Sequence, residues 1–304
     1  MAFISYHTRR DFALLAPLLL STLLTAQTVA PTPAKKAMFW KVSSRDNVVY
    51  LLGSVHLGTK GMFPLAKEIE DAFDRSAVLA VEIDINRIDF KKMQIEVTKL
   101  GLYPEGDTLW NHIRPETRTA LEQFCTAFGA PVERFTTMKP WLISMSAEML
   151  PVLKNGMDPN LSVDRYFLDK AKEKKRIVEI ESADAQYKLF AGFPDDVQEK
   201  ILLDEMKVAG RAQDKAKRME NAWIAGDAAA LDRIGAEDPT GPPEVQRAVL
   251  QDRNPRMADA AEQLLKSQEI GFVMVGAAHM AGKEGIVATL ESRGYKVEQV
   301  TLKP

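Results

Sequence analysis

The sequence has little of the chemistry that builds disulfides and cysteine-ligated metals. Among its 304 residues there are one cysteine, Cys125, and four histidines. A single cysteine excludes an internal disulfide and a zinc site made of cysteines. Because Cys125 lies in a helical pattern, we expect it to be a small buried residue rather than a reactive thiol.

The chain also lacks an excess of charge of either sign. It has 40 basic and 42 acidic residues and a formal net charge of −2. This balance argues against a general nucleic-acid-binding protein. We interpret the basic run at residues 170–176 as a solvated helix face, and we expect no nucleic-acid partner.

Long apolar runs are missing except near the N-terminus. There, an apolar stretch from Phe12 to Leu24 follows Arg9-Arg10 and precedes small residues and prolines. This order is typical of a secretory signal. We therefore expect residues 1–30 to be a signal peptide, of either the Sec or the twin-arginine type. The protein should be exported to the periplasm or cell envelope, or secreted, with no transmembrane span in the mature chain.

No flexible Gly/Ser-rich linker divides the rest of the chain. We therefore interpret residues 38–304 as a single domain. Residues from 86 to about 260 have mostly helical periodicity, for example at 115–128 and 195–210, with one short strand pattern at 176–181. Strand patterns stand on both sides of this helical insertion. The order predicts an α/β fold with a mixed or mainly parallel sheet.

Two similar units stand at the ends of this domain. An apolar run at residues 48–52 ends in the sequence Gly53-Ser54-Val55-His56, and a second run at 272–275 ends in Gly276-Ala277-Ala278-His279. Each is followed by a glycine-containing turn, a helical pattern and another strand pattern, so the chain repeats β-GxxH-α-β. In the first unit, Pro64 is expected to begin the helix. A histidine after each strand lies where open α/β sheets bind ligands.

A carboxylate follows a third apolar run. Glu82 ends the buried strand predicted at residues 77–81, and a buried carboxylate needs a partner or a metal. With His56 and His279 it makes a set that suits a divalent metal (Zn, Mn, Co or Fe) and leaves positions open for water. One GxxH alone is weak evidence, because glycine and histidine also meet at strand ends for packing reasons. Its repetition in matching contexts favours a metal site.

Other polar residues have both a structural and a functional interpretation. Glu181 ends the strand predicted at residues 176–181 and is either a supporting carboxylate or a salt-bridge residue. Arg253 could hold a carboxylate or stabilise an oxyanion, and Asn254 could cap the next helix. Asp164 fits a solvated helix face, and His112 fits an exposed position at the start of a helix.

Taken in order, the motifs resemble those of the TraB/GumN family, which is related to the Tiki and PrgY proteins. The resemblance covers nearly everything after the signal. It rests on residues 39–42, 50–56, 81–84, 139–141, 163–164, 179–181 with Gln186, 222–227, 252–254 with Met257, and 275–282. One departure is Ser162, where the family pattern has glycine.

The resemblance implies a divalent metal held by two GxxH histidines and a glutamate, as in the Tiki proteins, which act as metal-dependent proteases. It makes His56, Glu82 and His279 the metal site. Glu82 either ligates the metal or accepts the proton of the attacking water. The resemblance also implies that Glu181 and Arg253 are supporting or transition-state groups, with Arg253 at the oxyanion.

From this likeness we expect a metal-dependent hydrolase of the cell envelope, a peptidase with a peptide or protein substrate. Two alternatives stay open. The first is a haem- or iron-binding protein, like the more distant ChaN proteins. The second is a non-catalytic partner of envelope or exopolysaccharide machinery. The sequence indicates no oligomeric state, and likeness of fold alone does not decide among these functions.

Overall fold

The computed structural model describes residues 36–153 and 157–302, and the expected signal peptide at residues 1–30 lies outside them. These described residues belong to one compact unit. The strands are β1 Lys36–Ser43, β2 Val48–Ser54, β3 Val78–Val81, β4 Arg176–Glu179, β5 Gly271–Gly276 and β6 Lys296–Thr301. The helices are α1 Lys67–Arg75, α2 Phe90–Gly101, α3 Pro115–Phe128, α4 Pro140–Leu153, α5 Val163–Ala171, α6 Ala183–Ala191, α7 Asp195–Val208, α8 Ala212–Ala225, α9 Ala228–Ala236, α10 Pro243–Gln246, α11 Asn254–Lys266 and α12 Ile286–Ser292.

The six strands form one sheet in the order β4-β3-β5-β2-β1-β6. Neighbours among β4, β3, β5 and β2 are parallel, whereas β1 is antiparallel to β2 and β6. The expected α/β class with a mainly parallel sheet is therefore confirmed. Because the four parallel strands end at the same edge, the residues that follow them meet there: Glu181, Glu82, His279 and His56.

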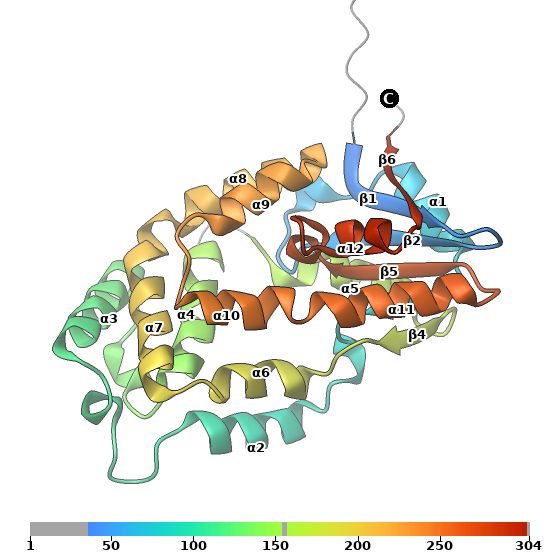
Figure 1. Cartoon of the computed structure of the whole chain (residues 1–304). Helices are drawn as coiled ribbons and strands as arrows, with labels where there is room; N and C mark the ends of the chain where they lie inside the picture. Colours follow the sequence, from blue (N-terminus) through green and yellow to red (C-terminus); the bar gives the residue numbers. More distant parts are fainter. Residues whose placement is uncertain (1–35, 154–156, 303–304) are drawn as a thin grey trace, which may run out of the picture. The chain divides into compact units, whose positions relative to one another are not determined.

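The middle of the sheet is buried on both faces, as its continuous apolar runs predict. Every residue of β3 is at most 2% exposed. On one face Phe272 of β5 packs against Phe73 of α1 and Phe167 of α5, with ring centroids 5.4 and 5.2 Å apart. The buried faces of α11 and α12 belong to the same core. Figure 1 shows α11 and α12 in front of the sheet and α1 and α5 behind it.

Helices α3, α4 and α7 enclose a second hydrophobic core in the long segment between β3 and β5. Its members include Leu121, Phe124, Ile143, Leu202 and Met206. Cys125 lies in this core and is 3% exposed, as the sequence predicts. Helix α3 has the predicted bounds because Pro115 occupies its first turn and Gly129 ends it with a left-handed φ of 68°.

One predicted helix start is wrong. Helix α1 begins at Lys67 rather than at Pro64. The Phe63–Pro64 peptide bond is cis, and Ala66 is extended with a ψ of 142°. Leu65 is buried between them, at 8% exposure. An apolar side chain, that of Leu65, therefore enters the core before the helix begins.

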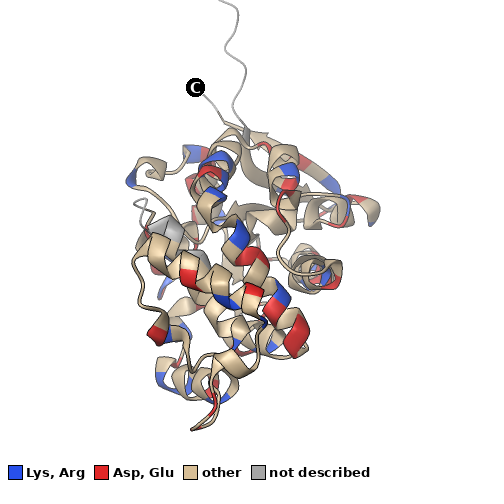
Figure 2. Cartoon of the chain, turned by 90° about the vertical axis from the view of Figure 1, so that its left-hand side faces the viewer, with Lys and Arg blue, Asp and Glu red and all other residues tan. Residues whose placement is uncertain are grey.

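Charged residues of both signs occur on the surface of the described residues. In the view of Figure 2, basic and acidic residues are interspersed along the helices. Some oppositely charged residues that lie four positions apart in the same helix form exposed ion pairs, such as Arg118 with Glu122 in α3. Such pairs contribute little to the stability of a protein. None of the described helices combines the length and the apolar character needed to cross a bilayer.

Candidate metal centre

The two GxxH turns lie side by side because β2 and β5 are hydrogen-bonded neighbours. In their parallel register Gly53 lies opposite Val275, and Ser54 lies opposite Gly276. A Cβ atom on Gly53 would lie only 3.0 Å from the backbone Cα of Ala277. The first motif therefore needs glycine so that the second turn can pack against it.

The second motif glycine borders the predicted site residues. A Cβ atom on Gly276 would lie 3.3 Å from Oε1 of Glu82, 3.6 Å from Cδ2 of His279 and 3.8 Å from Nε2 of His56. The backbone φ of Gly276 is −49°, so conformation alone does not require glycine there. What the missing side chain leaves is space at the point where the three predicted metal residues converge.

His279 is buried at 5% exposure and held in one orientation. Its Nδ1 lies 2.6 Å from Oδ1 of Asn254, whose own Nδ2 donates to the carbonyl of Glu284 at 2.7 Å. An amide oxygen only accepts, so Nδ1 carries the proton and Nε2 keeps its lone pair. Burial lowers the pKa of His279 to about 4. The ring is therefore neutral at pH 7 and can donate its lone pair to a metal.

His56 projects from the rim of the site, with its side chain 70% exposed. Its Nδ1 lies 3.0 Å from Oδ2 of Asp164, and Oδ1 of the same carboxylate accepts a hydrogen bond from the Ser54 hydroxyl at 2.7 Å. The hydrogen bond to Asp164 raises the pKa of His56 to about 9. Because Nδ1 is held by the carboxylate, Nε2 is the nitrogen on the side of Gly276.

Glu82 directly follows β3 and is 8% exposed. Its Oε1 accepts the backbone N–H of Gly276 at 2.6 Å, and its Oε2 accepts Nη2 of Arg253 at 2.6 Å. Gln186 of α6 lies near the same Oε2, at 3.4 Å. The carboxylate is thus fixed in orientation beside the two histidines. Oε2 accepts from both Arg253 and Gln186, so Oε1 is the oxygen that retains a second lone pair.

Arg253 joins Glu82 to Glu181. Its Nε donates to both oxygens of Glu181 at 3.1 and 3.0 Å, and its Nη2 also reaches Glu181, at 2.7 Å. Its Nη1 donates to the carbonyl of Val249 at 2.8 Å. Although burial opposes it, hydrogen bonding from Arg253 holds the pKa of Glu181 below its ordinary value. Nε and Nη2 are therefore committed to carboxylates, which favours a positioning role for Arg253 over the expected oxyanion contact.

Two residues of the site have roles that sequence reasoning missed. The helical pattern predicts a solvated position for Asp164, but its side chain is 18% exposed and holds His56. Asn254 is expected as a helix cap, but it is the first residue of α11 and holds His279. The motifs around Val163-Asp164 and Arg253-Asn254 in the family resemblance are the signal that could have revealed both.

His112 makes a separate pair. It follows a short 3-10 turn before α3, lies 2.7 Å from Asp107 and stacks on the ring of Tyr103. Its exposure agrees with the sequence prediction. Since its carboxylate and aromatic partners are local, this histidine has a structural explanation that does not involve the candidate centre.

The two motif histidines fit a divalent metal. An oxygen holds Nδ1 of each ring, as is usual for metal-ligating histidines, and Gly276 leaves space beside them. His279 is neutral at pH 7, whereas His56, with a pKa of about 9, must lose its Nε2 proton before it can bind a metal. Within residues 36–153 and 157–302, no group of three or more His, Cys, Asp or Glu side chains is placed so that it could hold a metal ion. The part of the arrangement that fits a metal is therefore the oriented histidine pair, with Glu82 fixed at its side.

The chain belongs to the TraB/PrgY/gumN family, whose sequence pattern matches residues 38–299. This membership is the one that its motifs predict. It is 26% identical to the uncharacterized protein YbaP of Escherichia coli (strain K12) over 147 residues, which are 48% of this chain and 53% of that relative. The YbaP protein of Shigella flexneri matches with the same identity and coverage. The chain thus spans about half the length of these relatives. An uncharacterized protein of Treponema pallidum (strain Nichols) is 20% identical over 273 residues, which is 85% of this chain and 81% of the relative. No solved structure matches the chain.

Proposed function

We propose that this member of the TraB/PrgY/gumN family is a metal-dependent hydrolase that cleaves peptide bonds in the cell envelope. The observation that carries the proposal is the convergence of His56, His279 and Glu82 on one point beside Gly276. The envelope location is supported by the signal-like pattern at residues 1–30.

In this proposal His56 and His279 hold the ion through their Nε2 atoms. Asp164 and Asn254 keep the two rings in the ligating orientation by holding Nδ1. A divalent Zn, Mn, Co or Fe ion bound there would supply Lewis acidity for attack of water on a carbonyl.

Glu82 is the proposed proton acceptor. Its Oε1 is the oxygen that lies 3.3 Å from the Cβ position of Gly276, so it faces the space between the rings. A carboxylate in hydrogen-bond reach of an attacking water can accept its proton at that oxygen. Arg253 holds Oε2, and with it the angle of the carboxylate.

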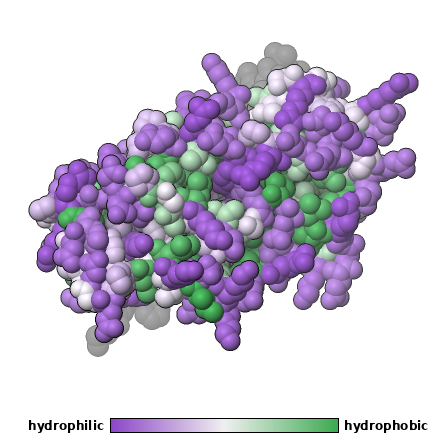
Figure 3. Space-filling model, turned by 60° about the horizontal axis from the view of Figure 1, so that its bottom comes forward, coloured by the Kyte–Doolittle hydropathy of each residue, from purple (hydrophilic) through white to green (hydrophobic). Residues whose placement is uncertain are grey.

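A peptide substrate is supported by apolar surface near the site. Helix α6 carries Gln186, which lies 3.4 Å from Glu82, and α2 packs against α6. On α2 the side chains of Phe90 and Ile95 are 64% and 59% exposed. Figure 3, which brings this side of the molecule forward, shows patches of apolar side chains among polar ones. Such patches mark surfaces that bind apolar partners.

The test is hydrolysis of pooled fluorogenic peptides by the purified chain, loaded in turn with Zn²⁺, Mn²⁺, Co²⁺ or Fe²⁺. We expect turnover that a chelator removes and that His56→Ala and His279→Ala each lower by more than about 100-fold, beyond the usual effect of losing an outer partner. His112→Ala is the matched control, because it removes a histidine with its own carboxylate partner. Undiminished turnover in both site variants would refute the proposal.

A further inference from the structure

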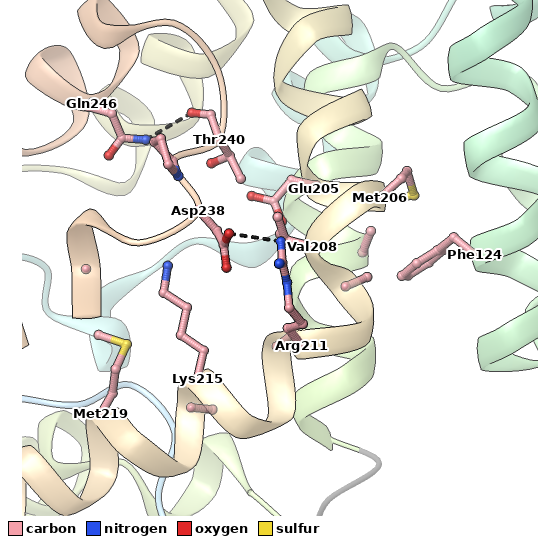
Figure 4. A pocket seen from close by; sticks show the side chains of 16 residues that line it. Phe124, Glu205, Met206, Val208, Arg211, Lys215, Met219, Asp238, Thr240 and Gln246 are labelled. Atoms are coloured by element: carbon pink, nitrogen blue, oxygen red, sulfur yellow. Dashed lines mark hydrogen bonds and ion pairs between the residues drawn. The ribbon is translucent and has the colours of Figure 1, made fainter. Parts of the chain in front are cut away.

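A cavity of about 340 Å³ is lined by residues of α3, α4, α7, α8 and α9 and of the loop at 237–242. None of its lining residues belongs to the candidate metal centre, and Figure 4 shows the side chains around it. Its volume is near the lower end of small-molecule sites, about 300–1,000 Å³. The cavity is thus large enough for a small ligand and is not explained by the proposed hydrolysis.

The floor of this cavity is apolar. Phe124 and Met206, which are 4% and 8% exposed, lie there with buried Ala147. Ala216 and Met219 of α8 continue the apolar wall. None of these side chains has a strong hydrogen-bonding group, and methionine adapts its shape to a ligand. This part of the cavity suits an aliphatic chain and disfavours a polar one.

The mouth carries two cations. Lys215 donates to the backbone carbonyl of Glu237 at 2.6 Å, and no ion pair to a carboxylate is recorded for it among the described residues. An ammonium has three donors, so two remain. Arg211 pairs with Asp238 at 2.9 Å, but its side chain is 66% exposed, and such pairs are easily exchanged. Figure 4 shows Lys215 and Arg211 on either side of Asp238.

Asp238 itself is held in an uncommon conformation. Its φ is 51°, in the left-handed region that costs a residue with a Cβ atom. The contact with Arg211 accompanies this conformation at the rim of the cavity. A ligand carboxylate on Arg211 would displace this exposed ion pair, and such pairs contribute little to stability.

We propose that the cavity binds a medium-chain fatty acid. The carboxylate lies between Lys215 and Arg211, replacing Asp238, and the alkyl chain lies along Met206 and Phe124. Glu205 also lines the mouth, so an anion bound there has a carboxylate nearby. Recognition of the anion therefore depends on Lys215, whose hydrogen bond is to a neutral backbone carbonyl rather than to a carboxylate.

The test is calorimetric titration of the full chain with sodium dodecanoate below its micellar concentration. Dodecyltrimethylammonium, which has the same chain length and a cationic head, is the control ligand. We expect one saturable site for dodecanoate, with affinity at least about tenfold above that of the cationic amphiphile, the effect of a charged hydrogen bond. Equal affinities, or no saturable site, would overturn the proposal.

Two variants locate the site. Ala216→Phe fills the cavity and should abolish saturable binding. Lys215→Glu changes only the mouth and should weaken dodecanoate binding at least about tenfold. This variant tests the location of the site even if Ala216→Phe does not fold. The matched control is Lys207→Glu, at an exposed lysine of α7 that pairs with Glu116, and it should bind as the unaltered chain does. Unchanged binding by Lys215→Glu would overturn the assignment.

Discussion

At the residue scale, the two glycines of the GxxH motifs serve different purposes. Gly53 is required by the backbone of Ala277, which lies 3.0 Å from the position of its missing Cβ. Gly276 borders the side chains of His56, His279 and Glu82 instead. The same motif residue is therefore structural in one copy and belongs to the candidate site in the other.

This difference predicts that alanine at Gly53 affects stability, whereas alanine at Gly276 affects metal binding. Gly53→Ala should lower the free energy of unfolding by about 1–3 kcal/mol, because the backbone opposite must shift. Gly276→Ala should leave the melting temperature close to that of the unaltered chain, since its methyl group contacts only side chains at 3.3–3.8 Å. It should instead weaken metal binding, as measured by titration calorimetry. A larger loss of stability for Gly276→Ala than for Gly53→Ala would contradict this assignment.

Sequence reasoning finds the histidines because each ends a recognisable strand with glycine before it. It does not find the partners of their Nδ1 atoms. Asp164 lies 108 positions from His56 in the chain, and a helical period shows only that a residue faces one side. The roles of Asp164 and Asn254 follow from tertiary contacts, which periodicity does not encode.

At the element scale, a short irregular helix brings Arg253 and Asn254 to the site. Helix α10 is followed directly by a π-helical turn, Arg247–Gln251. The carbonyl of Val249 in that turn accepts Nη1 of Arg253. Wide turns of this kind occur often at functional sites. Here the turn directs the guanidinium toward two buried carboxylates rather than toward solvent.

Removing this guanidinium should be costly. Arg253→Met removes the buried cation between the Glu82 and Glu181 side chains, which are 10% and 2% exposed, and should lower the free energy of unfolding by about 3–5 kcal/mol. The control is Arg256→Met, because Arg256 lies 3.8 Å from Glu181 but is 63% exposed. It should cost less than about 1 kcal/mol. Urea unfolding measures both, and equal losses would refute the positioning role of Arg253.

Sequence patterns predict most elements well where local signals mark both ends. The helical pattern expected after the second GxxH motif forms helix α12, Ile286–Ser292. The strand predicted at 176–181 ends earlier, at Glu179. The backbone N–H of Glu181 still donates to the carbonyl of Glu82 at 2.9 Å, so the two carboxylate residues stay adjacent. That contact depends on the neighbouring strand and is invisible in the local pattern.

At the scale of the whole molecule, the two motif histidines have opposite effects on how stability depends on pH. His279 has a folded pKa of about 4 against an ordinary 6.5. Between these values the unfolded chain binds the proton and the folded chain does not, so stability falls as the pH falls from 6.5 to about 4. The folded pKa of His56 is about 9. Its contribution is complete below pH 6.5 and is lost as the pH rises through 9.

We therefore predict that metal-free protein unfolds more easily at both ends of the range between pH 4 and pH 9. His279→Asn should remove part of the acid loss, at most about 3 kcal/mol. His56→Asn should flatten the alkaline limb only. Urea midpoints measured in the presence of a chelator report both effects. An acid limb unchanged by His279→Asn would show that this ring is not buried in its neutral form.

The order of the strands goes beyond what the sequence predicts. Its patterns indicate strands and a mixed or mainly parallel sheet, but not that β5 lies between β2 and β3. The chain forms β2 and β3 in succession, with α1 between them. The strand that separates them is almost 200 residues further on. Because β5 lies between β2 and β3, the residues His56, His279 and Glu82 follow adjacent strands. The sequence therefore suggests the site residues but does not show that they lie together.

The most direct test of the central claim is elemental analysis of the protein purified without chelator, beside the His56→Ala/His279→Ala double variant and the His112→Ala control. The account predicts that the unaltered chain and the control carry Zn, Mn, Co or Fe in stoichiometric amount and that the double variant carries none. Asp164→Ala, which frees Nδ1 of His56, should lower the metal affinity about 10–100-fold. Equal metal content in the double variant, or no metal in any of the proteins after reloading, would contradict a metal centre at the GxxH histidines.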